Sequence, residues 1–246
     1  MSSTRFPGKV LQPIHGFASI VYMARRVRDA RLLDDVVVLT STHSSDDPLA
    51  ECLQAAGIAM FRGNLDDVLR RFVDAARSYD AQEIVRLTGD CPLIDSAIID
   101  RVVAARRAAG ADYASNIDPP TFPDGLDVEC CTRAALEQAD NAARRRDERE
   151  HVTLWMRSDE AGLLRTNVRA IADFSHLRLT VDYPDDLEAV RRIVAMTTVP
   201  SPDLFEILRI LSAQPDILDL NAHSRNEALT VAPAGNLEPH LIGVKP

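Results

Sequence analysis

VRLTGDCPLIDSAIID, residues 85–100, joins an apolar run to a helical pattern. The run ends at Leu87, just before a Gly-Asp pair, as a buried strand ends at a turn. Apolar residues then recur at the spacing of one helix face from Ile98 to Val103. This change of period predicts a strand followed by a helix, with the carboxylate of Asp90 at the carboxyl end of the strand.

Strands and helices alternate in the same way through the first hundred residues. The predicted strands are 35–41, 58–61 and 83–89, and the predicted helices are 17–31, 48–56, 65–79 and the one that contains residues 98–103. This βαβα order predicts an α/β fold, in which a mainly parallel sheet is covered by helices on both faces.

The regular alternation of predicted strands and helices becomes less clear after residue 110. Residues 116–127 (NIDPPTFPDGLD) predict a long loop, and a loop of this length inside a compact domain is more often functional than accidental. Further strands are predicted at 128–132, 163–171 and 177–181, and further helices at 184–196 and 203–213. We expect residues 1–226 to form one domain and residues 227–246, which lack periodicity, to form a loosely ordered tail.

The bulk composition narrows the class of protein. With 46% hydrophobic and 26% charged residues, the 246-residue chain has a globular composition. Its formal net charge of −9 argues against a nucleic-acid partner, because binding to the phosphate backbone needs clustered cations. No apolar run approaches the ~18 residues of a membrane span, and the four cysteines show no CxxC spacing. We therefore expect a cytoplasmic protein with reduced cysteines and no membrane partner.

Two carboxylates follow predicted strands. Asp90 follows the strand at 83–89, and Asp182 follows the strand at 177–181. In open parallel sheets, ligands bind outside the carboxyl ends of the strands. Two carboxylates at such an edge, completed by substrate phosphates, are what a Mg²⁺ site needs. The alternative is that each aspartate only caps a helix or makes an Asx turn.

Other charged segments allow two interpretations. Residues 2–9 (SSTRFPGK) form a loop that can wrap a triphosphate with backbone N–H groups, Arg5 and Lys9, or else a disordered basic terminus. The charges of residues 62–72 (RGNLDDVLRRF) fit a solvated helix face, and those of residues 149–153 (REHVT) an ordinary surface. Cys91 is interpreted as a packing residue.

Eight segments, in order, resemble the bacterial cytidylyltransferases grouped with spore coat polysaccharide biosynthesis protein F, relatives of the CMP-KDO and CMP-sialic acid synthetases. The segments are SSTRFPGKVL, LTSTHSSDDP, FRGNLDDVLRRF, VRLTGDCPLID, YASN, FPDGLDVE, REHVT and LRLTVDYPDDLE. The resemblance extends to about residue 226 and implies the nucleotide-diphospho-sugar transferase fold, a Rossmann-like α/β/α domain.

The resemblance also implies roles for individual residues. Asp90 and Asp182 match the pair that holds Mg²⁺ in related synthetases, and Arg5 and Lys9 match the loop that grips the phosphates. The implied nucleotide-binding residues are Arg5, Lys9, Thr40, Ser41 and Gly63; the implied residues at the acceptor sugar are Asn116, Asp124, Gly125, Asp127, Glu150 and His151.

One departure from the family concerns the start of the chain. Relatives begin with a strand immediately before the segment that aligns with Met1. We therefore expect the centre of the sheet to lack the family's first strand, which would leave two rows of backbone groups unpaired and the domain poorly stable. If the domain is stable nevertheless, another segment must fill that position.

The resemblance implies Mg²⁺-dependent transfer of a cytidylyl group from CTP to an acidic sugar, with release of pyrophosphate, for surface polysaccharide or glycan biosynthesis. It also implies a homodimer. A sugar-1-phosphate nucleotidyltransferase or a glycosyltransferase on the same fold is an alternative, although GDCP is not the DxD motif that a glycosyltransferase would normally carry. A non-catalytic nucleotide-binding protein is a third possibility, because of the missing strand, but the presence of both Asp90 and Asp182 argues against it.

Overall fold

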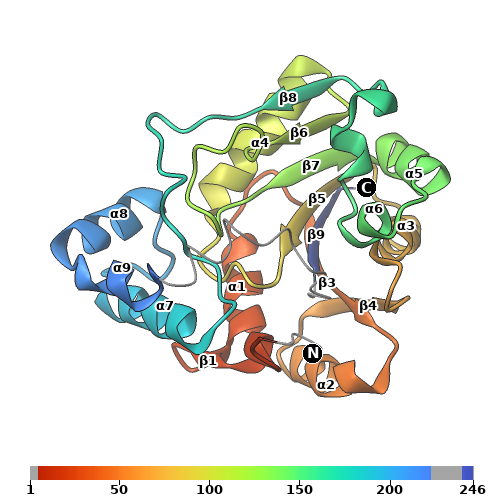
Figure 1. Cartoon of the computed structure of the whole chain (residues 1–246). Coiled ribbons are helices and arrows are strands. Elements are labelled where there is room, and N and C mark those ends of the chain that lie inside the picture. The colour runs from red at the N-terminus through yellow and green to blue at the C-terminus, as the bar shows by residue number, and fades with distance from the viewer. Residues whose placement is uncertain (1–4, 223–239, 246) are drawn as a thin grey trace.

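The computed structural model describes residues 5–222 and 240–245, which form a single mixed β-sheet with helices on both faces and a small hairpin at one end (Figure 1). The strands of the sheet are β3 (Asp35–Ser41), β4 (Ala59–Gly63), β5 (Glu83–Thr88), β6 (Tyr113–Ser115), β7 (Glu129–Thr132), β8 (Arg165–Asn167) and β9 (His240–Lys245). Their order is β4-β3-β9-β5-β7-β6-β8. Strands β7 and β9 run against the common direction of the others.

The helices divide between the two faces of the sheet. They are α1 (Ser19–Val27), α2 (Asp47–Ala55), α3 (Val68–Ser78), α4 (Ser96–Ala109), α5 (Arg133–Ala142), α6 (Arg146–Glu150), α7 (Pro184–Met196), α8 (Leu204–Ala213) and α9 (Asp216–Leu220). Short 3₁₀ turns are η1 (Lys9–Leu11), η2 (Ser44–Asp46), η3 (Trp155–Arg157) and η4 (Asp159–Ala161); β1 (Pro13–Ile14) and β2 (Phe17–Ala18) form the hairpin.

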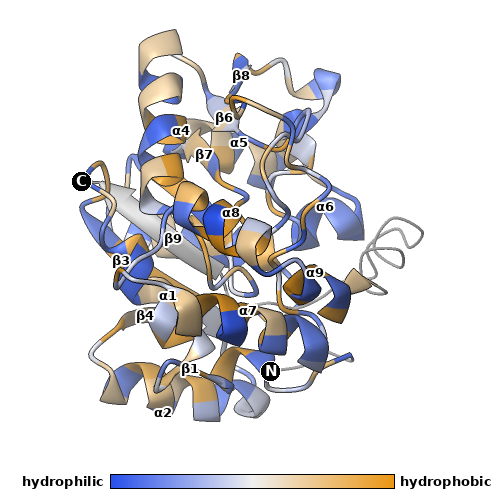
Figure 2. Ribbon diagram, turned by 90° about the vertical axis from the view of Figure 1, so that its left-hand side faces the viewer, coloured by the Kyte–Doolittle hydropathy of each residue, from blue (hydrophilic) through white to orange (hydrophobic). Residues whose placement is uncertain are grey.

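Two hydrophobic cores lie on opposite faces of the sheet, because successive strand residues point to opposite sides. Val36 and Val38 of β3 pack with α1, α2, α4, α7 and α8, and Figure 2 views the molecule from the side of α7 and α8. Val37 and Leu39 pack with α3, α5 and η3 on the other face. The α/β/α architecture predicted from the alternation of periods is confirmed.

Local sequence signals explain where the helices that follow the strands begin and end. The Asp95 side chain accepts a hydrogen bond from the backbone N–H of Ala97 at the start of α4, and Gly110, at φ 58°, ends the same helix. Pro184 occupies the first turn of α7, where a missing N–H costs nothing. These signals fix the ends of the two helices that follow the predicted metal-binding aspartates.

The centre of the sheet is filled by the C-terminal strand. In Figure 1, β9 (blue) lies between β3 and β5, and it pairs antiparallel with both, from Asp35↔Val244 to Leu39↔His240 on one side and from Glu83↔Lys245 to Thr88↔His240 on the other. The expectation of an unpaired gap between these two strands is therefore wrong.

Residues 227–246 were expected to form a loosely ordered tail, but six of them, His240–Lys245, form strand β9. Residues 227–239 and 246 lie outside the described residues. The predicted strand at 177–181 is also wrong, because that segment makes only an isolated bridge, Asp124↔Arg178. In the described part of the chain, no helix has the length and apolarity needed to cross a bilayer.

Candidate active site

Lys9 joins two carboxylates beyond the end of β5. Its Nζ atom lies 2.8 Å from Oδ1 of Asp182 and 3.6 Å from Oδ2 of Asp90. The lysine is only 2% exposed, so its charge requires these partners. Three residues far apart in the sequence therefore meet at one point of the sheet edge.

Backbone hydrogen bonds bring the two aspartates together. The N–H of Val181 donates to the carbonyl of Asp90 at 2.8 Å, which holds the segment before Asp182 against the exit of β5. The same segment pairs with the 116–127 loop, because the N–H of Leu179 donates to the carbonyl of Asp124 at 2.7 Å. The site is thus built where these two connecting segments cross the end of β5.

Arg178 ties the acidic residues of both segments together. Its guanidinium donates to Asp124 at 2.7 Å and to Asp182 at 2.5 Å, and it is 5% exposed. Burial alone would raise the pKa of Asp182, but Lys9 and Arg178 outweigh burial and lower it. Asp182 is therefore held in its anionic form.

Two further carboxyl groups near this point are less well compensated. The pKa of Asp124 is raised, chiefly by burial and partly by Asp90 and Asp182. The pKa of Asp127 is raised to about 8 by burial and by the carboxylates of Asp124, Glu129 and Asp90. The sheet edge thus carries more negative charge than its own cations neutralise, which favours a bound cation.

The 116–127 loop is held in place by side-chain and backbone packing. The buried Asn116 amide donates to the carbonyl of Leu126 and accepts from the N–H of Val128, both at 2.8 Å. Gly125, at φ 101°, lies so close to the 179–180 backbone that a Cβ atom would approach Leu179 C and Thr180 N to 2.8 Å. Only glycine fits this close approach without a shift of the backbone.

The exit of β3 carries a closed hydrogen-bond network. The hydroxyls of Thr40 and Ser41 donate to Oδ2 of Asp46 at 2.7 and 2.6 Å, and the N–H of Ser41 donates to the same oxygen at 2.9 Å. All three residues are buried. Gly63, at the end of β4, packs against the Arg71 side chain, which a Cβ atom would meet at 2.9 Å.

Arg5 lies at the outer side of the carboxylate pair. Its guanidinium nitrogen is 3.9 Å from Oδ2 of Asp182, and its charge lies 5.5 Å from the centre of the Tyr183 ring. Its side chain remains 34% exposed, so it can also contact a ligand in solution.

Two cavities lie near these groups and share Ile117 and Arg157 in their linings. One, of about 590 Å³, is lined by Asp124, Asp127 and Arg178 among others. The next, of about 460 Å³, is lined by Arg86, Glu129 and His151 among others. Burial is the main reason that the pKa of His151 is lowered, so its imidazole is neutral at pH 7.

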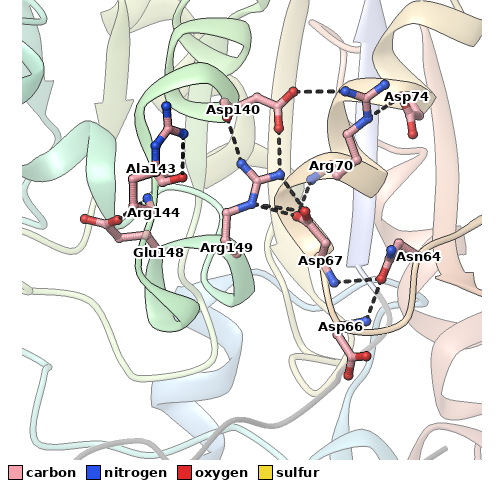
Figure 3. A network of polar contacts seen from close by, with 10 residues as sticks. All are labelled: Asn64, Asp66, Asp67, Arg70, Asp74, Asp140, Ala143, Arg144, Glu148 and Arg149. Atoms are coloured by element: carbon pink, nitrogen blue, oxygen red, sulfur yellow. Dashed lines mark hydrogen bonds and ion pairs between the residues drawn. The ribbon is translucent and has the colours of Figure 1, made fainter.

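A polar network fixes the helix that precedes His151 (Figure 3). Arg149 of α6 donates to both carboxylate oxygens of Asp67, the N-cap of α3, at 2.6 to 3.1 Å, and to Asp140 of α5 at 2.7 Å. Asn64 holds the loop before α3 by accepting the N–H of Asp67 at 2.9 Å. The charged segments at 62–72 and 149–153 thus pair with each other rather than only with solvent.

Comparison with known proteins shows what this chain is similar to. Residues 1–217 match the family model described as cytidylyltransferase. The chain is 31% identical to spore coat polysaccharide biosynthesis protein SpsF of Bacillus subtilis over 88% of this chain and 92% of that protein. The structure of a cytidylyltransferase from Leptospira borgpetersenii superposes with a TM-score of 0.84 at 31% identity, over 89% of this chain and 92% of that one.

The chain belongs to the cytidylyltransferase family. A CMP:2-keto-3-deoxy-manno-octonic acid synthetase complexed with CTP shares the fold, with a TM-score of 0.61 at 19% identity, over 79% of this chain and 94% of that one. The sequence-based assignment to the family and to the nucleotide-diphospho-sugar transferase fold is therefore confirmed.

The predicted site residues fall into distinct groups. One group lies near the exit of β5 and consists of Arg5, Lys9, Asp90, Asp124, Asp127 and Asp182. A second group is engaged in hydrogen bonds or close packing within the chain and consists of Thr40, Ser41, Gly63, Asn116 and Gly125. His151 lines the second cavity, and Glu150, at the end of α6, is partly buried. Their roles in binding stay predictions.

Sequence reasoning missed Arg178, the cation that connects Asp124 with Asp182. One signal was present, because Arg178 stands between Leu177 and Leu179 in an apolar run where a charge needs a buried partner. It also missed the ion pair between Arg86 and Glu129, two residues that lie 43 positions apart in the sequence.

Proposed function

We propose that the chain transfers a cytidylyl group from CTP to a hydroxyl of an acidic sugar and releases pyrophosphate, in cytoplasmic steps of surface polysaccharide biosynthesis. Membership of the cytidylyltransferase family and the name of the Bacillus subtilis relative support this proposal. The observation that carries it is the meeting of Asp90, Asp182 and Lys9 at the exit of β5, the edge where this type of sheet binds ligands.

We propose that Asp90 and Asp182 hold Mg²⁺. Both offer hard oxygen ligands, and the raised pKa of Asp127 indicates uncompensated negative charge beside them. Among the described residues, no group of three or more His, Cys, Asp or Glu side chains could hold a metal. Mg²⁺ takes one or two carboxylates and completes its shell with phosphate oxygens and water.

The reaction is a displacement at phosphorus. The acceptor hydroxyl oxygen forms a bond to the α-phosphorus, the bond from that phosphorus to the bridging oxygen of the β-phosphate breaks, pyrophosphate leaves, and the hydroxyl proton passes to water. Mg²⁺, when bound, supplies positive charge to the phosphate oxygens. Arg5 and Lys9 add two cations beside the same point, and Arg178 keeps Asp182 oriented through its 2.5 Å hydrogen bond.

The decisive experiment is a nucleotide panel. Thermal stability and pyrophosphate release are measured with CTP, ATP, GTP and UTP, with and without Mg²⁺, in the presence of 3-deoxy-manno-octulosonate or another sugar acid. We expect selective stabilisation by CTP with Mg²⁺ and pyrophosphate release that depends on the sugar. Equal responses to all four nucleotides would contradict the proposal.

We also propose a homodimer. Phe205 and Ile171, 63% and 82% exposed, flank an apolar hollow between α4 and α8, and large exposed apolar residues of this kind often mark an association surface. Sedimentation of the protein at micromolar concentration should show twice the mass of the chain. A single species with the mass of one chain would refute this proposal.

A further inference from the structure

The segment that carries Asp90 is mostly buried and has no regular secondary structure. Residues 89–95 connect the end of β5 to the start of α4, and Cys91, Leu93 and Ile94 lie in the core. Within the segment, the N–H of Ile94 donates to the carbonyl of Cys91 at 3.1 Å. Buried carbonyl groups need hydrogen-bond donors, so donors from other parts of the chain fix the path of such a segment.

Arg26, near the end of α1, supplies donors to this segment. Its Nε and Nη2 atoms donate to the carbonyl of Ile94 at 3.1 and 2.9 Å, and Nη2 also donates to the carbonyl of Leu93 at 3.0 Å. The planar guanidinium holds its N–H groups in a rigid fork. The two carbonyl groups are therefore held in one orientation by a single side chain.

Arg26 and Asp95 also attach the segment to the start of α8. The Nη2 atom of Arg26 donates to the carbonyl of Pro202 at 2.7 Å, and Oδ2 of Asp95 accepts the N–H of Leu204 at 2.8 Å. Arg26 and Asp95 are 3% and 4% exposed. The end of the segment that leads into α4 is thus fixed to both α1 and α8.

The guanidinium of Arg26 is surrounded by groups that compensate its burial. Burial lowers the pKa of Arg26, whereas Tyr22 and the carboxylate of Asp95 favour the charged form. The charge lies 5.8 Å from the centre of the Tyr22 ring. Hydrogen bonds from a charged donor are stronger than those between neutral groups, so this arginine is a firm support for the carbonyl groups that it contacts.

Asp90 lies three residues before Leu93 in the same segment. Its carbonyl accepts the N–H of Val181 at 2.8 Å, and its carboxylate lies 3.6 Å from Nζ of Lys9. A shift of the Leu93 carbonyl therefore moves the backbone that carries Asp90. A displacement of about 1 Å at a reacting group can cost on the order of 100-fold in rate.

We propose that Arg26 is a positioning residue for the metal site: through the carbonyl groups of Leu93 and Ile94, it holds Asp90 where Asp90 and Asp182 can share one cation. The identity of this cation site rests on the proposed function, whereas the support of the segment by Arg26 rests on the hydrogen bonds above. Arg26 is buried and acts through the backbone.

The test compares wild type, Arg26→Gln, Arg26→Lys and the control Arg106→Gln. Arg106 of α4 donates to Glu83, the first residue of β5, at 2.5 Å and to the carbonyl of Ala111 at 2.9 Å. The control thus removes a guanidinium with similar contacts at the opposite end of the same strand. Urea unfolding gives the stability of each protein, and all binding is measured where every variant is folded.

Mn²⁺, which binds to the same kinds of oxygen ligands as Mg²⁺, is the spectroscopic probe. Its binding to the protein with CTP is followed by electron paramagnetic resonance, and CTP binding in EDTA by calorimetry. We expect Arg26→Gln to weaken Mn²⁺ binding by about 10- to 100-fold, the usual effect of losing a support of a metal ligand, and to leave CTP binding in EDTA unchanged. Arg26→Lys should lie in between, because an ammonium keeps the charge but lacks the planar fork.

The control separates positioning from stability. Arg106→Gln should lose stability and bind Mn²⁺ as wild type does. A loss of Mn²⁺ affinity that follows the loss of stability equally in Arg26→Gln and Arg106→Gln would overturn the proposal. Unchanged Mn²⁺ affinity in either folded Arg26 variant would overturn it too, and so would failure of both to fold, since the guanidinium would then serve the fold as a whole. Wild type that binds neither CTP nor Mn²⁺ would contradict the proposed function itself.

Discussion

The exits of β3 and β5 lie at the same edge of the sheet, but their carboxylates have opposite surroundings. At β3, one oxygen of Asp46 accepts three hydrogen bonds from Thr40 and Ser41. Burial would raise the pKa of Asp46, yet these bonds outweigh it and hold the pKa far below its ordinary value. The charge of this aspartate is satisfied chiefly by hydrogen bonds within the chain, with the charge of the buried Arg71 nearby.

At β5, the carboxylates are crowded and depend on cations. Asp90 and Asp182 share Lys9, and Asp127 has a pKa raised to about 8. The comparison teaches that a carboxylate at a strand exit is not by itself a ligand-binding group. A saturated hydrogen-bond shell makes it part of the scaffold, and excess negative charge leaves it able to bind a cation.

Removal of residues 240–246 should unfold the domain and with it both strand exits, because β9 lies between β3 and β5. Its register spans five residues of β3 and six of β5, and each buried unpaired N–H or C=O costs about 1–3 kcal/mol. We expect the loss to exceed a domain's typical ~5–15 kcal/mol of stability. Thermal unfolding followed by circular dichroism should show no cooperative transition, whereas removal of Pro246 alone should change little.

Substitution at the β5 exit should separate chemistry from stability. We expect Asp90→Asn to reduce kcat by about 10²–10³-fold with little change in melting temperature, since Asp90 lies at 3.6 Å from Lys9. Asp182→Asn should lose similar activity and also destabilise the fold by ~2–4 kcal/mol, because Lys9 and Arg178 lose a buried partner. Steady-state rates at saturating Mg²⁺ and urea unfolding check both; full activity in Asp90→Asn would remove this residue from the metal site.

Substitution at the β3 exit should reduce stability and leave activity almost unchanged. Asp46→Asn replaces a charged acceptor of three hydrogen bonds by a neutral amide, which should cost ~2–3 kcal/mol of unfolding free energy. At a temperature where the variant is folded, kcat should remain within about threefold of wild type. A thousandfold loss of activity with unchanged stability would show that the closed network takes part in catalysis.

The smallest expected effect concerns pH. In the folded protein Asp127 binds its proton with a pKa of about 8, against ~3.9 in an unfolded chain. The folded state therefore holds more protons between these values, so this group lowers the unfolding free energy as pH rises from ~4 to ~8. Without metal, Asp127→Asn should be more stable than wild type at pH 8 and equal to it at pH 4. Parallel stability curves in EDTA for the two proteins would contradict this.

Local sequence signals were sufficient to predict those features of the structure that depend only on nearby residues. The bounds of α7 follow from Pro184 and its apolar spacing, and β3 coincides with the β-branched run at 35–41. The positions of Asp90 and Asp182 also followed, although residues 177–181 lie against the β5 exit through single hydrogen bonds rather than as a strand.

Features that depend on distant partners could not be predicted in this way. The role of Asp46 is one example, because nothing in the sequence shows that Thr40 and Ser41 turn toward it. Strand β9 was missed because its six residues follow a segment without periodicity. They pair with strands roughly 150 to 210 positions earlier, and the open position between those strands is visible only once the sheet is assembled.

The central place of β9 has a consequence for biosynthesis. Residues 240–245 leave the ribosome after every other described element has been made, yet they pair with β3 and β5, which end at Ser41 and Thr88. A nascent chain folds from its N-terminus, and exposed strand edges promote aggregation while they wait for a partner. We therefore expect the sheet to close only after translation has reached its last strand, so that a holding chaperone is needed until then.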